Sequence, residues 1–116
     1  MIAHGLDELR RQGGMDWIQQ EQGWGATPDD VISALSKDGF DECKREMTTS
    51  RRDIRPAGGL WQGVNTRTGS VASAIWVNRA PFPRAIVFIT IDGVSVGDGS
   101  APNLDRDPYR DDGGEA

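Results

Sequence analysis

The chain has 116 residues, the size of one ordinary domain, and thirteen Lys and Arg against eighteen Asp and Glu give it a formal charge of −5. This acidic balance argues against a surface built to hold a phosphate backbone, and the single cysteine, Cys43, excludes an internal disulfide. His4 is the only histidine, so we predict no metal site made by this chain alone and no cofactor.

The first part of the chain has helical spacing. Ile2, Leu6 and Leu9 recur at i, i+4 and i+7, which predicts a first helix that ends at Gly13. A short second helix is expected over residues 15–22, with Trp17 and Ile18 as its apolar contribution.

The clearest helix start lies at Thr27. Thr is a good N-cap, Pro28 suits the first helical position, and Asp30 resembles the acid of a capping box. We therefore predict a helix over residues 28–37. An apolar stripe at i, i+3 and i+7 predicts a further helical turn or two, through Phe40, Cys43 and Met47.

After Met47 the pattern becomes that of β-strands. Strands are expected over residues 60–66, 71–78 and 85–92, and a fourth over 94–96 follows the hairpin turn pair Asp92-Gly93. The third strand is nearly continuous in Ile, Val and Phe, which is typical of a buried strand. The predicted fold class is α+β, with N-terminal helices followed by a three- to four-stranded antiparallel sheet, in one domain over residues 1–96.

Most of the negative charge lies in the last segment. Residues 97–116 hold six acidic and two basic residues, so this segment carries four of the five net negative charges. Its Gly, Pro and Asp content and its lack of periodicity predict an acidic, disordered C-terminal tail.

The expected location is the cytoplasm. The N-terminus lacks a basic start followed by an apolar stretch, which predicts no secretory signal. The longest apolar run, over residues 85–91, is far shorter than the roughly 20 residues of a membrane span. We expect no membrane partner.

One region is basic within this acidic chain. Between residues 44 and 55 there are five basic and two acidic residues, and three more arginines follow before the next carboxylate at Asp92. If residues 44–84 wrap onto one sheet face, that face is basic, and a local field decides where phosphate can bind. The alternative is that these charges are solvated loop and helix-end residues.

Three short stretches resemble the MqsR family of bacterial toxins. They are residues 31–40 (VISALSKDGF), the triplet Met47-Thr48-Thr49 and residues 60–64 (LWQGV). In that family a helix with V-I-x-x-L-S-x-x-D-F precedes Y-K-S-M-T-T and then W-Q-D-V-Y. The resemblance spans about residues 20–65. It implies a RelE-like fold and a ribosome-independent endoribonuclease that cleaves single-stranded mRNA and is neutralised by a cognate antitoxin protein.

The resemblance also implies site residues. The family's active-site Lys and Gln fall on Arg45 and Gln62. This chain has three extra residues between Phe40 and Met47, so Lys44 could take the lysine's place. The family's Tyr and Lys on the next strand would fall near Ala72 and Ala74, which leaves several catalytic roles unfilled.

RNA cleavage needs a base for the 2′-OH, stabilisation of the phosphorane and help for the leaving group. Lys44 or Arg45 can stabilise the phosphorane, and Gln62 can orient phosphate or ribose. The general base is not assigned. Glu46 is the nearest carboxylate in the sequence, His4 is remote in the sequence, and Arg is a poor base at pH 7. The further RNA-binding candidates are Arg51, Arg52, Arg55 and Arg67.

Two other functions remain open. One is a non-catalytic interaction protein on the same scaffold, which fits the acidic tail and the vacant catalytic positions. The other is an accessory or immunity-type protein, for which low pI and small size are typical. The nuclease hypothesis predicts that Lys44, Arg45 and Gln62 lie together on one basic face.

Overall fold

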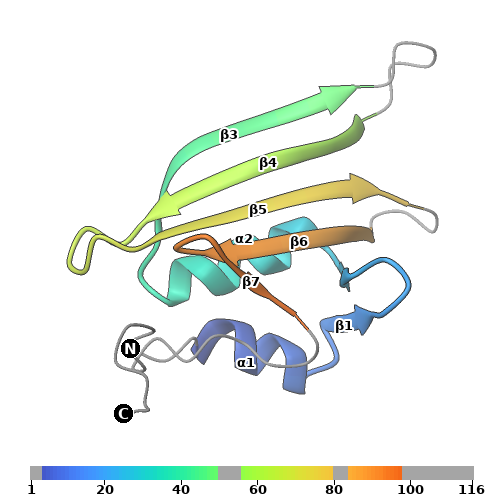
Figure 1. The fold of residues 1–116 in the computed structure, drawn as a ribbon, viewed down its shortest axis with the longest axis horizontal. Helices are drawn as coiled ribbons and strands as arrows, with labels where there is room; N and C mark the ends of the chain where they lie inside the picture. Colours follow the sequence, from blue (N-terminus) through green and yellow to red (C-terminus); the bar gives the residue numbers. More distant parts are fainter. Residues whose placement is uncertain (1–3, 50–55, 80–83, 98–116) are drawn as a thin grey trace.

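The computed structural model describes residues 4–49, 56–79 and 84–97 (Figure 1). The elements of this part of the chain are α1 His4–Arg11, β1 Met15–Ile18, β2 Gly23–Ala26, α2 Pro28–Lys37, β3 Asp41–Thr49, β4 Pro56–Val64, β5 Val71–Asn78, β6 Ala85–Ile91 and β7 Val94–Val96. All the strand pairs are antiparallel, and the sheet order is β1-β2-β6-β5-β4-β3. β2 and β7 both pair with β6. β2 pairs with residues 85–87 of that strand, and β7 pairs with residues 89–91.

The expected α+β, RelE-like arrangement is wrong. The described part of the chain is mostly β, with seven strands in one antiparallel sheet and two short helices. Two segments that were predicted to be helical form strands instead. Both find strand partners elsewhere in the chain, and ladder hydrogen bonds then satisfy their backbone groups.

The first of these segments is residues 15–22. It contains β1, which forms a hairpin with β2, so that Met15 lies opposite Ala26 and Trp17 opposite Trp24. Gln22 in the connecting turn has a φ of 54°, a left-handed backbone that no helix allows.

The second segment is β3. Phe40 is buried just before the strand, but Cys43 and Met47 are exposed, so the apolar spacing does not mark one buried helix face. β3 pairs along its length with β4, and a bulge between Glu42 and Lys44 takes up Cys43.

Other predicted elements are confirmed. α2 has the predicted bounds, 28–37, and Thr27 has the extended backbone of an N-cap, although its side chain makes no capping hydrogen bond. β5 matches the predicted residues 71–78, β6 and β7 match within one residue, and β4 begins at Pro56, earlier than predicted. The predicted tail, residues 97–116, lies outside the described residues apart from Gly97.

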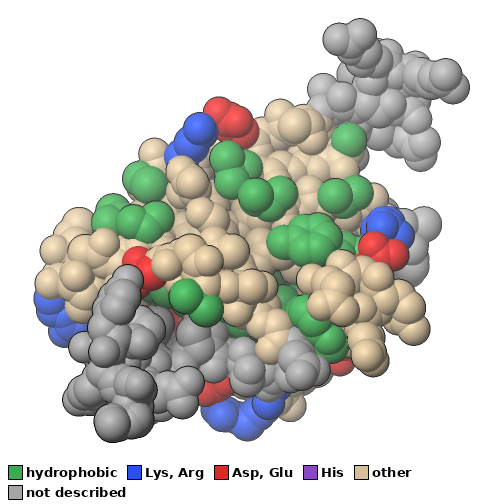
Figure 2. Space-filling view, in the orientation of Figure 1, with side chains coloured by type: hydrophobic (Ala, Val, Ile, Leu, Met, Phe, Trp, Pro, Cys, Tyr) green, Lys and Arg blue, Asp and Glu red, His purple; other side chains and the backbone are tan. Residues whose placement is uncertain are grey.

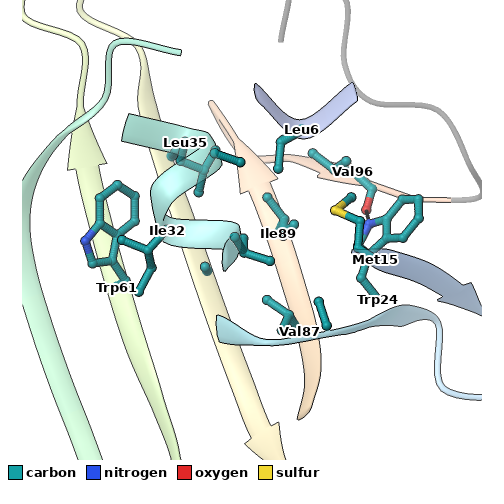
Figure 3. Close-up of a cluster of buried hydrophobic side chains, with 14 of the residues drawn as sticks. Leu6, Met15, Trp24, Ile32, Leu35, Trp61, Val87, Ile89 and Val96 are labelled. Carbon is teal, nitrogen blue, oxygen red and sulfur yellow. Dashed lines mark hydrogen bonds between the residues drawn. The ribbon is translucent and has the colours of Figure 1, made fainter. Parts of the chain in front are cut away.

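The core lies between one face of the sheet and the two helices (Figure 3). Trp61, Trp24 and Ile89 point from the strands toward Leu6 of α1 and Leu35 of α2, and all are buried. The indole Nε1 of Trp24 donates to the Val96 carbonyl oxygen at 2.8 Å, which ties β7 to the core. Trp61 and Trp76 are thus core side chains.

Glycines of β4 make room for these large rings. A Cβ added at Gly63 would meet the ring of Trp61, and one added at Gly59 would meet the ring of Trp76. The tryptophans can therefore lie over the backbone of β4 beneath α2. Neither helix in the described residues is long and apolar enough to span a membrane.

Candidate functional site

The three predicted catalytic residues do not share one face of the sheet. Lys44 lies directly opposite Gln62 across the β3–β4 pair, on the face turned away from the helices, which we call the open face. Arg45 lies opposite Trp61, whose side chain is in the core, so Arg45 is on the helix face. The structure therefore joins Lys44 with Gln62 and separates both from Arg45.

Each of these side chains already has a partner within the chain. The Nζ of Lys44 lies 3.6 Å from the Oε2 of Glu46, and the Nε2 of Gln62 donates to the Ser73 Oγ at 3.3 Å. On the helix face, Arg45 donates from Nε and Nη2 to one oxygen of Glu42, at 3.0 and 2.9 Å. These hydrogen bonds from Arg45, and next the one from the Trp61 indole, lower the pKa of the Glu42 carboxyl.

The predicted RNA-binding arginines are not assembled around this pair. Arg67 is exposed in the turn between β4 and β5, and its backbone N–H donates to the Asn65 side chain at 3.0 Å. Arg79 and Arg84, at the other end of β5 and β6, pair with Glu21 and Asp16 at 2.8 and 3.3 Å. The remaining candidates, Arg51, Arg52 and Arg55, lie outside the described residues.

The basic region of the sequence is thus dispersed in the fold. Its described cations fall on both faces and at both ends of the sheet, and four of them are paired with carboxylates. In residues 4–49, 56–79 and 84–97 no group of three or more His, Cys, Asp or Glu side chains could hold a metal ion.

The open face has a chemistry of its own. Ile75 lies between Leu60 on β4 and Phe88 on β6, and in the next row Val77 lies opposite Ile86. We call these five side chains the apolar band. A polar row flanks the band and crosses the sheet through Lys44, Gln62, Ser73 and Thr90.

Much of the apolar band is in contact with solvent. Ile75 is 51% exposed, Val77 46% and Phe88 36%, and Figure 2 shows hydrophobic side chains gathered on this face over β4, β5 and β6. No residue of these three strands is charged, in a chain of which 27% is charged. Within the described residues the helices cover only the other face of these strands, and no described layer covers Ile75, Val77 or Phe88, whereas Ile86 is buried.

Sequence reasoning missed this face, although a signal for it exists. β5 and β6 carry apolar residues at both alternating sets of positions, which is typical of strands covered on both faces. Two short helices are enough to cover one face only. The second apolar set is Ile75, Val77 and Phe88, and its presence in the sequence could have predicted an exposed apolar surface.

A second surface feature is a half-open hollow of about 150 Å³ between α1 and α2. Its lining combines Leu9 and Ala34 with the charged residues Glu8, Asp30 and Lys37. The hollow does not contain any of the predicted site residues.

The candidate functional site is therefore the open face, with the apolar band at its centre and the polar row along one side. Its residues come from neighbouring strands of a regular sheet, so its shape is set by backbone pairing and not by loops. Neither models of known protein families, nor curated proteins, nor solved structures gave a match to this chain.

Proposed function

We propose that this chain is a non-catalytic binding protein that holds another protein chain on the open face of its sheet. The observation that carries the proposal is the apolar band, built only from uncharged side chains and exposed at Ile75, Val77 and Phe88. Contiguous exposed apolar surface of this kind is typical of interaction sites, because burying it removes unfavourable contact with water.

Burying the apolar band should contribute measurably to the free energy of binding. Burying a fully exposed Val, Ile or Phe side chain contributes roughly 1.5–3 kcal/mol, so covering three that are about half exposed contributes roughly 3 kcal/mol. Since about 1.4 kcal/mol corresponds to a tenfold change in affinity, the band alone favours binding by about a hundredfold.

The same face gives less support to RNA cleavage. A phosphate contact needs an available cation, but Lys44 is beside Glu46, and the amide of Gln62 already donates to Ser73. Arg45, the other candidate for stabilising the phosphorane, is on the opposite face. Single-stranded RNA and an antitoxin as partners stay predictions from the sequence, whereas the accessory or immunity type of protein agrees with a binding face.

The first experiment separates binding from catalysis. The purified protein is incubated at stoichiometric concentration with a long single-stranded RNA, beside a variant carrying Lys44→Ala, Arg45→Ala and Gln62→Ala. We expect intact RNA in both reactions. Cleavage by the natural sequence that is lost in the triple variant would overturn the proposal and restore the endoribonuclease hypothesis.

The second experiment looks for the bound protein. A photoreactive benzoylphenylalanine replaces Val77 in the apolar band or, as a control, Val94, which is an exposed valine outside the band. Irradiation of cells that encode the chain should give a protein adduct from position 77 and much less from position 94. Equal yields at the two positions, or none at position 77, would contradict the proposal.

A further inference from the structure

We infer that the occupant of the open face is a second copy of this chain, so that two sheets pack face to face around a two-fold axis. This inference rests on the proposed function, because it names the partner of the same face. In such a dimer the helices of each copy lie on the outside and the two apolar bands meet in the middle.

The charge on the face is compatible with a copy of itself. A two-fold contact brings each surface patch against the same patch of the partner, so a patch with a net charge would face a like charge. The apolar band has no charged residue. Among the described residues at its borders, Lys44 is paired with Glu46 on one side and Arg84 with Asp16 on the other. The patch is therefore complementary to itself.

The size of the face also fits a dimer. Strands lie about 4.8 Å apart, so the five spacings from β1 to β3 span about 24 Å, and the nine residues of β4 extend about 30 Å. Because β1 and β2 have only four residues each, this rectangle of roughly 700 Å² is an upper limit for the whole face, polar row included, and it lies just below the roughly 800 Å² that each partner contributes to a standard interface.

The geometry of the sheet favours contact between two copies through the open face and not through the edge strand β3. Sheets that pack face to face lie about 10 Å apart and interdigitate their apolar side chains, which Ile75 and Phe88 can supply as a cross-strand pair. The edge strand β3, by contrast, carries a bulge and five charged residues, namely Asp41, Glu42, Lys44, Arg45 and Glu46. Bulges and charges on an edge are features that block pairing between sheets.

The test is the mass of the protein in solution. Sedimentation equilibrium of the full chain should give twice its mass of 12.6 kDa at micromolar concentration. Val77→Lys places a charge in the apolar band of the proposed interface and should weaken the dimer by more than about tenfold. Val94→Lys makes the same change at a similarly exposed valine outside the band and should leave the dimer intact.

Far-UV circular dichroism and a thermal melt show whether each variant is folded. If Val77→Lys does not fold, Ile75→Lys makes the same test in the neighbouring row of the band. A natural chain that stays monomeric at high concentration, or a dimer that folded Val77→Lys and Ile75→Lys leave unchanged, would overturn the inference. A monomer that still forms an adduct with a different protein at position 77 would overturn only this inference and leave the proposed function standing. A monomer without any adduct would overturn both.

Discussion

At the scale of single residues, the Glu42 carboxylate on the edge strand β3 interacts both with Arg45 on the same strand and with Trp61 on the neighbouring strand β4. Its Oε1 accepts hydrogen bonds from Arg45 and, at 2.9 Å, from the indole of Trp61, and these bonds lower its pKa, that of Arg45 first. A lowered folded-state pKa means that the bonds stabilise the fold at pH values above the unfolded pKa. This contribution is lost as the pH falls through the folded pKa.

We expect Arg45→Met to raise the pKa of Glu42 toward its ordinary value, because the guanidinium is removed and the aliphatic stem is kept. Titration of the Glu42 side chain by NMR measures the shift. Lys44→Met is the matched control, since Lys44 pairs with Glu46 on the other face of β3. An unchanged Glu42 titration in Arg45→Met would show that Arg45 is not the main cause.

The site could be predicted from the sequence only in part. Alternation along a strand places Trp61 and Gln62 on opposite faces, and the structure has them so. Which of Lys44 and Arg45 joins Gln62 depends on the register with β4. The bulge at Cys43 sets that register, and no local pattern in the sequence reveals it.

At the scale of elements, the contact between α1 and α2 depends on Gly5. Its backbone N–H donates to the Asp38 Oδ1 at 2.6 Å, and a Cβ at this position would meet the backbone carbonyl of Ala34. Helix propensity favours Ala over Gly by up to about 1 kcal/mol, whereas overpacking costs about 1–3 kcal/mol. The clash should win, because a backbone carbonyl within α2 cannot rotate away.

Gly5→Ala should therefore lower the free energy of unfolding by about 1–2 kcal/mol, as measured by urea denaturation. Glu8→Ala, at an exposed position of the same helix, should change it by less than about 0.5 kcal/mol. A more stable Gly5→Ala variant would mean that α1 can move away from α2 without cost.

The elements that were predicted correctly carry their signals locally. α2 begins at a Thr-Pro pair and needs no distant residue to define its start. β1 and β3 instead depend on partners that a short window does not contain. Asp41 pairs with Val64 and Met15 with Ala26, and these partners decide between helix and strand where the apolar spacing is ambiguous.

At the scale of the whole molecule, net charge is a poor guide to the surface that binds. The chain carries −5, yet the three central strands of its sheet contain no charged residue. A contact through this face should depend on apolar burial and little on electrostatic steering. We expect added salt to leave the dimer intact, because screening acts on charges and the band has none.

Dimerisation should also appear in the thermal stability. Only the folded chain has the open face, so association adds to the free energy of unfolding and the apparent Tm rises with protein concentration. A tenfold rise in concentration adds about 0.7 kcal/mol per chain, which corresponds to an increase of about 3–5 °C in Tm for a domain of this size.

Calorimetry over a hundredfold range should show this rise for the natural chain and for Val94→Lys. Val77→Lys should melt at a lower temperature than Val94→Lys at each concentration, because its weaker dimer contributes less to the free energy of unfolding. A Tm of the natural chain that does not change with concentration would mean that the open face stays exposed to water in the isolated protein.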